Sequence, residues 1–141
     1  MVVISNSVII RCTPEQAFDY LSDHRSELEW NPNVRVMEKL TEGETRPGSR
    51  FRAKWTKSPV VELEILRFYR PHGWAYRNGG AIAVDLDITL EPVADGRATI
   101  LRSRFDAKAR GPIRLVFPLI VASLRREEAR NMQLIKERVE H

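Results

Sequence analysis

The feature that most constrains the fold is a change of hydrophobic period along the chain. Between residues 48 and 107, apolar and polar side chains alternate in several short segments, and over 113–139 the apolar residues recur with helical spacing. Alternation places successive side chains on opposite faces of a strand, whereas helical spacing gathers them on one side of a helix. A sheet with one apolar face and a single long helix to cover it must curl around that helix.

Helix signals complete the expected order of elements. Thr13 is suited to cap a short helix, with Pro14 at its first position and Gln16 placed to close a capping box. A second short helix is expected over residues 25–29, since Pro32 pushes the residue before it out of helical geometry. Pro118 lacks a backbone donor, so it should kink the C-terminal helix or restart it there. The expected strands are residues 2–11, 48–56, 60–70, 74–78, 81–90 and 99–107.

These elements predict one domain spanning residues 1–141. A chain of 141 residues is long enough to bury a core without disulfides or metals. The fold class is α+β, with a strongly curved antiparallel sheet wrapped around a long C-terminal helix. An apolar pocket is expected between the sheet and the helix.

One hairpin allows a prediction of strand register. If residues 57–59 form the turn, Lys54 faces Glu62 and Arg52 faces Glu64 on one side of the sheet. Such cross-strand pairs each contribute roughly 0.2–1 kcal/mol. The same register gathers the apolar residues of both strands on the other face: Phe51, Ala53, Trp55, Val61, Leu63 and Ile65.

Composition bounds the cellular setting. The single cysteine, Cys12, cannot form an internal disulfide, which predicts a reducing, cytoplasmic location. No stretch approaches the roughly 20 apolar residues of a membrane-spanning helix, so no integral membrane segment is expected. The first residues also lack the apolar run of a signal peptide.

The net charge of +4 comes partly from a basic stretch over residues 97–114. A surface for nucleic acid or for an anionic membrane would use such a patch. No aromatic residues are interleaved with these arginines on the same face, which favours a solvated strand face with a cationic rim. We therefore predict no nucleic-acid partner.

No residue pattern indicates a particular reaction. His24, His72 and His141 lack metal-ligand spacing with other ligand types, so neither a metal nor a cofactor is expected. Asp85 and Asp87 could be read as a catalytic carboxylate pair. Strand parity places them on the outer face with the arginines of the following strand, so an outer charge ladder is the better interpretation. No catalytic residue is assigned.

The candidate ligand site consists of large apolar and polar residues expected inside the curved sheet or on the inner side of the helix. Arg67 and Asn131 are its expected polar contacts, although a strand bulge would turn Arg67 outward and the helix end could leave the sheet at Asn131. Trp74 and Tyr76 face inward if the turn after them has three residues and outward if it has two. The full set is Trp30, Phe51, Trp55, Arg67, Trp74, Tyr76, Leu101, Ser103, Phe105, Phe117, Ile120, Leu124 and Asn131.

Four local patterns, in order, resemble those of a known superfamily. They are Thr-Pro-Glu-Gln-Ala-Phe at 13–18, Asp23 followed by Trp-Asn-Pro at 30–32, Gly-Ser-Arg-Phe at 48–51, and Leu-Glu-Pro at 90–92 followed by Gly96. Together they resemble the START-like (SRPBCC) superfamily, specifically its polyketide cyclase/dehydrase-like group. The resemblance covers nearly the whole chain. It implies a helix-grip fold whose cavity binds lipids, polyketides, sterols or other apolar molecules, and it supplies no universal catalytic motif.

Three functions follow as hypotheses. The first is a small-molecule binding or carrier protein with an apolar cavity for a lipid-, polyketide- or sterol-like ligand. The second is an enzyme of the polyketide cyclase, aromatase or dehydratase type. The third is a basic module that contacts membranes or partners through residues 97–114. The oligomeric state is left open, with a homodimer as the candidate assembly.

Overall fold

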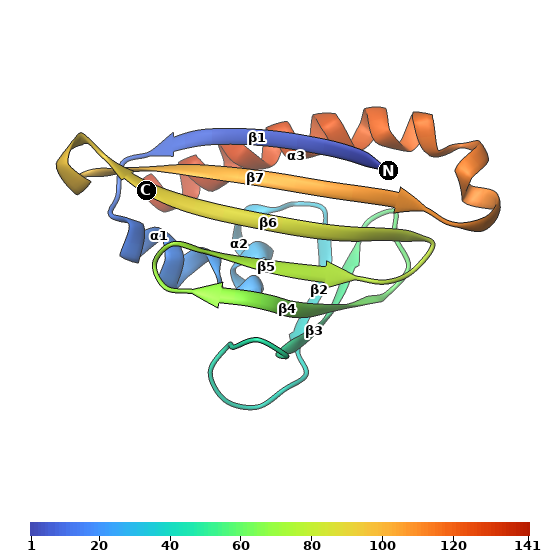
Figure 1. Cartoon of the computed structure of the whole chain (residues 1–141), viewed down its shortest axis with the longest axis horizontal. Coiled ribbons are helices and arrows are strands. Elements are labelled where there is room, and N and C mark those ends of the chain that lie inside the picture. Colours follow the sequence, from blue (N-terminus) through green and yellow to red (C-terminus); the bar gives the residue numbers. More distant parts are fainter.

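The computed structural model describes all residues 1–141, and it is built around one antiparallel sheet and one long helix (Figure 1). The sheet has seven strands in the order β1-β7-β6-β5-β4-β3-β2. The strands are β1 (Val2–Ile10), β2 (Val34–Lys39), β3 (Arg50–Trp55), β4 (Val61–Tyr69), β5 (Gly73–Asn78), β6 (Ile82–Val93) and β7 (Ala98–Ala109). The helices are α1 (Pro14–Leu21), α2 (Glu27–Trp30) and α3 (Phe117–Glu140).

The arrangement confirms the predicted α+β class with a C-terminal helix packed on a curved antiparallel sheet. α3 runs along one side of the sheet beside β1, and α1 and α2 lie on the same side (Figure 1). Gly73 shows how closely the strands approach, because a Cβ atom at that position would lie 2.3 Å from the carbonyl oxygen of Ile88. All three helices lie on one face of the sheet, and the other face is open to solvent.

The short helices form as their local signals predicted. The Thr13 hydroxyl accepts from the Gln16 amide at 3.2 Å, and the Gln16 side chain accepts from the Thr13 amide at 3.0 Å. A 3-10 turn (His24–Ser26) leads into α2, which ends where Asn31 leaves helical geometry before Pro32. The predicted short helix over 25–29 is thus a turn followed by one turn of α-helix.

The C-terminal helix begins later than the periodicity of residues 113–139 indicates. A separate 3-10 turn (Gly111–Leu115) precedes α3, and Pro118 lies in the first turn of the helix. A proline is tolerated there because the first amides of a helix have no intrahelical acceptor. The sequence left two alternatives at Pro118, a kink or a restart of the helix, and the structure shows a restart.

The predicted register of the β3–β4 hairpin is wrong by two residues, although both faces are assigned correctly. Arg52 pairs with Glu62, and Arg50 with Glu64. The chain reverses early because the Ser58 amide donates to the Trp55 carbonyl and the Ser58 hydroxyl accepts from the Trp55 amide. A shift of two residues keeps every side chain on its face, whereas a shift of one would invert them.

Arg67 does not face inward as the uninterrupted alternation of β4 predicted. The pairing of β4 with β5 shifts between Ile65 and Arg67, which leaves Leu66 as an extra residue in a β-bulge. The bulge turns Arg67 to the outer face, where it forms an ion pair with Asp87. The alternative in which a bulge turns Arg67 outward is the one observed.

Two clusters of buried apolar residues fill the space under the sheet. One surrounds Phe51 and Leu63 at the end formed by β2, β3 and β4. The other joins Phe18 of α1 and Ile135 of α3 to Trp74, whose ring meets that of Phe18 edge to face with centroids 5.5 Å apart. Trp74 and Tyr76 both point inward, which settles the question that the length of the β5–β6 turn left open.

The two halves of α3 make different contacts. Met132 and Ile135 in the C-terminal half are buried. That half is also tied to β1, since the Lys136 ammonium donates to the Ile9 carbonyl at 2.8 Å and Glu140 accepts from the Arg11 amide at 2.8 Å. No residue between Phe117 and Arg130 is fully buried. The N-terminal half therefore spans a gap and does not fill it.

Candidate functional site

The gap beneath the N-terminal half of α3 is a cavity of about 700 Å³. Its walls come from β5, β6 and β7 on the sheet side and from α2 and α3 on the helix side. More than half of the lining residues are hydrophobic. The volume falls within the ~300–1,000 Å³ of typical small-molecule sites.

Exposed lining residues mark the opening of the cavity. Val116 and Leu119 at the start of α3 lie on one side of it, and the turns after β3 and β5 supply Pro59 and Gly80 on the other. Leu119 is 76% exposed. The cavity therefore opens next to solvent-exposed apolar side chains.

Most of the residues predicted for the site lie on the cavity wall, and three do not. Arg67 is on the outer face, Phe51 is fully buried in the core behind the wall, and Phe117 packs against that core at the start of α3. The predicted residues found on the wall are Trp30, Trp55, Trp74, Tyr76, Leu101, Ser103, Phe105, Ile120, Leu124 and Asn131. Their contact with a ligand stays a prediction.

Three carboxyl groups lie on this wall, those of Glu27, Glu127 and Glu128. The Oε2 atom of Glu27 accepts from the Trp55 indole at 2.9 Å and from the Asn31 side-chain amide at 3.1 Å. Burial raises the pKa of Glu27, and these two hydrogen bonds oppose the shift by stabilising the charged form. Its Oε1 atom has no hydrogen-bond partner in the chain, so one side of the carboxyl group is open to an occupant.

Glu128 faces the same cavity from α3 and accepts no hydrogen bond from the chain. Burial raises its pKa to about 7, and the negative charges of Glu27 and Glu127 add to the shift. Burial, with the charges of Glu27 and Glu128, also holds the pKa of Tyr76 well above its ordinary value. These groups are therefore close enough to influence one another across the cavity.

His24 stays neutral at the edge of this cluster. Its ring centroid is 5.0 Å from that of Tyr76, and burial lowers its pKa to about 4 against the smaller effect of Asp23. The His24 Nε2 atom and the indole nitrogens of Trp30 and Trp74 are buried without a partner. All three residues line the cavity. The end of the cavity near His24, Glu27 and Glu128 therefore presents neutral ring nitrogens together with carboxyl groups.

Sequence reasoning missed His24, Glu27 and Glu128 as site residues. The first two lie in segments too short for periodicity to assign a face. Glu128 lies one helical turn from Leu124, on the side of the helix whose apolar residues predicted the core. A charged residue next to an apolar helix face was the signal that could have found it.

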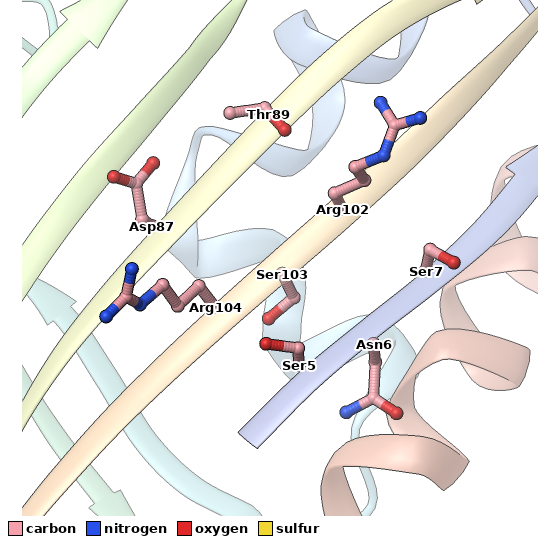
Figure 2. Close-up of a pocket in the computed structure, with 8 residues that line it drawn as sticks. All are labelled: Ser5, Asn6, Ser7, Asp87, Thr89, Arg102, Ser103 and Arg104. Atoms are coloured by element: carbon pink, nitrogen blue, oxygen red, sulfur yellow. The ribbon is translucent and has the colours of Figure 1, made fainter. Parts of the chain in front are cut away.

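A second hollow lies on the outer face, over β1, β7 and β6, and no hydrophobic side chain lines it (Figure 2). The charged groups in it already have partners: Asp87 pairs with Arg67, Arg102 with Glu91, and Arg104 with Asp106. The prediction that Asp85 and Asp87 lie on the outer face is confirmed, although their partners are Arg77 and Arg67 and not the arginines of β7. We interpret this hollow as a solvated ionic surface.

No group of three or more His, Cys, Asp or Glu side chains is arranged to hold a metal ion. No helix is both long enough and apolar enough to cross a membrane.

The comparison with protein families identifies the chain. The model of a family described as "Polyketide cyclase / dehydrase and lipid transport" matches residues 1–140. The chain belongs to that family. Membership suggests the binding of hydrophobic molecules and specifies neither a ligand nor an activity. No curated protein matches the chain.

Solved structures of bacterial proteins have the same fold at low sequence identity. A protein from Thermus thermophilus is 14% identical with a TM-score of 0.80, over 98% of this chain and 97% of that one. A START superfamily protein from Mycobacterium smegmatis is 17% identical with a TM-score of 0.77, over 98% and 97%. The Aha1 dimer from Colwellia psychrerythraea is 15% identical with a TM-score of 0.73, over 99% and 97%. These likenesses confirm the helix-grip fold of the family member described here.

Proposed function

We propose that this family member binds one elongated, mainly apolar small molecule in the cavity beneath α3. The observation that carries the proposal is the mostly hydrophobic cavity of about 700 Å³ between the sheet and the helix, which is open on one side. Close-packed interiors contain few voids larger than a water molecule, so a space of this size is a feature of binding proteins. The family's link with lipid transport supports the same proposal.

In this proposal the hydrocarbon part of the ligand contacts Trp55, Phe105, Ile120 and Leu124. Asn131, which lines the cavity from α3, supplies a polar contact. The ligand enters beside Leu119, where the wall is open. Burial of its apolar surface supplies most of the binding free energy.

The experiment combines native mass spectrometry of the purified protein with melting curves in octan-1-ol. A co-purified small molecule is expected in the mass spectra, and octan-1-ol should raise the melting temperature because it binds only the folded chain. Ser123→Trp should abolish the rise by filling the cavity from α3. Ala122→Trp is the matched control, since Ala122 is exposed on the same helix. An equal rise in both variants would contradict binding inside the cavity.

A second candidate function is an enzyme of the cyclase, aromatase or dehydratase type. The observation that favours it is Glu128, because a carboxyl group whose pKa is about 7 is suited to proton transfer near neutral pH. The discriminating measurement is the mass of a bound molecule before and after incubation with the protein. A carrier returns its ligand unchanged, whereas an enzyme releases a product of altered mass or chromatographic mobility.

A further inference from the structure

The carboxyl groups in the cavity differ from the acidic groups on the surface, because no cation of the chain neutralises them. Surface carboxylates such as Asp19 and Asp85 form ion pairs with arginines. Glu27, Glu127 and Glu128 form none. Arg130 and Lys57 line the cavity, but both are exposed and neither pairs with a carboxylate. An apolar space with several unneutralised carboxyl groups is costly for the protein to maintain.

The hydrogen bonds that the chain supplies satisfy only part of this acidic cluster. Both bonds to Glu27 reach the same oxygen atom, Oε2. The only bond to Glu127 comes from the Ser123 hydroxyl, at 3.3 Å. Glu128 receives none. An occupant of the cavity could therefore donate hydrogen bonds to the free oxygens of Glu27 and Glu128.

Unpartnered ring nitrogens support a polar occupant independently of the carboxyl groups. His24 is 5% exposed and Trp74 is 4% exposed, and both line the cavity. The Nε2 atom of His24 and the Nε1 atom of Trp74 have no hydrogen-bond partner in the chain. The Trp74 indole N–H can only donate, whereas Nε2 of neutral His24 can accept from an N–H group when the ring carries its proton on Nδ1. Buried polar groups without partners are uncommon in native proteins, which indicates that this end of the cavity receives a polar group.

The charges at this end of the cavity select the chemistry of that group. His24 is neutral, and the two cationic residues of the wall, Lys57 and Arg130, are exposed, so the carboxyl groups make any charge in the interior of the site negative. A carboxylate or phosphate on the ligand would meet like charges, whereas an ammonium group would donate to both carboxyl groups. We propose that the ligand carries a protonated amine that binds between Glu27 and Glu128, with its hydrocarbon part filling the apolar cavity. This inference rests on the proposed binding function.

The test compares three probes that share a chain length and differ in the polar end: octylamine, octan-1-ol and octanoic acid. Affinities are measured by isothermal titration calorimetry at about pH 8, which is above the pKa of Glu128 and below that of an alkylamine. Octylamine should bind at least about tenfold more tightly than octan-1-ol, since hydrogen bonds to charged groups are stronger than neutral ones. Octanoic acid should bind most weakly.

Glu128→Gln and Glu27→Gln should each reduce the preference for octylamine over octan-1-ol. Glu137→Gln is the control, because Glu137 is exposed on the same helix. Octan-1-ol or octanoic acid binding as tightly as octylamine would overturn the amine inference and leave the binding function standing. Failure of all three probes to bind would overturn both. A preference for octylamine that survives both substitutions would also overturn the inference.

Discussion

The two halves of α3 show how one helix can both stabilise a core and cover a cavity. The C-terminal half buries Met132 and Ile135 and is hydrogen-bonded to β1, whereas the N-terminal half leaves Leu119 76% exposed. Both halves carry apolar residues at helical spacing. Met132 and Ile135 also reach the cavity wall, but they belong to a packed cluster with Phe18 and Trp74, whereas the first half faces mainly open space. An apolar helix face therefore indicates a partner surface and does not by itself indicate a filled core.

The largest expected effect is in the C-terminal half. Ile135→Ala should destabilise the protein by ~2–5 kcal/mol, because it deletes a buried side chain from a packed cluster and leaves a cavity. The measurement is the free energy of unfolding from urea titration. Leu119→Ala is the control in the other half, and it should change stability by no more than about 0.5 kcal/mol. Equal costs at both positions would remove the contrast between the halves.

A smaller effect is expected from Glu128, where the two halves meet. Its pKa is raised from 4.5 to about 7 in the folded chain, so its contribution to stability is present below pH 4.5 and is lost as the pH rises towards 7. Glu128→Gln should therefore be more stable than the native protein above pH 7, by on the order of 1–2 kcal/mol. Unfolding titrations across this pH range check the sign. The difference in stability between Glu128→Gln and the native protein should disappear near pH 4. The control variant Glu137→Gln should show no such difference.

The smallest expected effect concerns the ionic contacts of the C-terminal half. Arg138 pairs with Glu29 at 2.9 Å, and both side chains are about half exposed. Arg138→Ala should cost about 0.2–1 kcal/mol, since surface ion pairs contribute little and salt screens them. Unfolding in low and high salt gives the comparison. A cost as large as that of Ile135→Ala would show that charge pairs, and not apolar packing, hold this half of the helix.

The sequence predicted the order of most elements and the apolar faces because both depend on periodicity, which is local, but it gave no bounds for β2 (Val34–Lys39). It could not give the register of the β3–β4 hairpin, because hydrogen bonds of Ser58 move the turn without changing side-chain parity. A bulge that turns Arg67 outward was one of two alternatives, and the structure places it at Leu66, where the apolar positions change parity from Ile65 to Leu66 and Phe68. Glu27 and His24 reach the cavity through the packing of short segments, and that information is tertiary.

The bulge at Leu66 has a consequence for comparing this chain with its relatives. Leu66 is the extra residue in β4, so a relative that lacks it would still place its equivalents of Ile65 and Phe68 on the inner face and that of Arg67 on the outer face. A one-residue gap in an alignment therefore belongs at Leu66. If the gap is moved past Phe68, the alignment compares inward-facing positions with solvent-facing ones, and apparent conservation in this part of β4 loses its meaning.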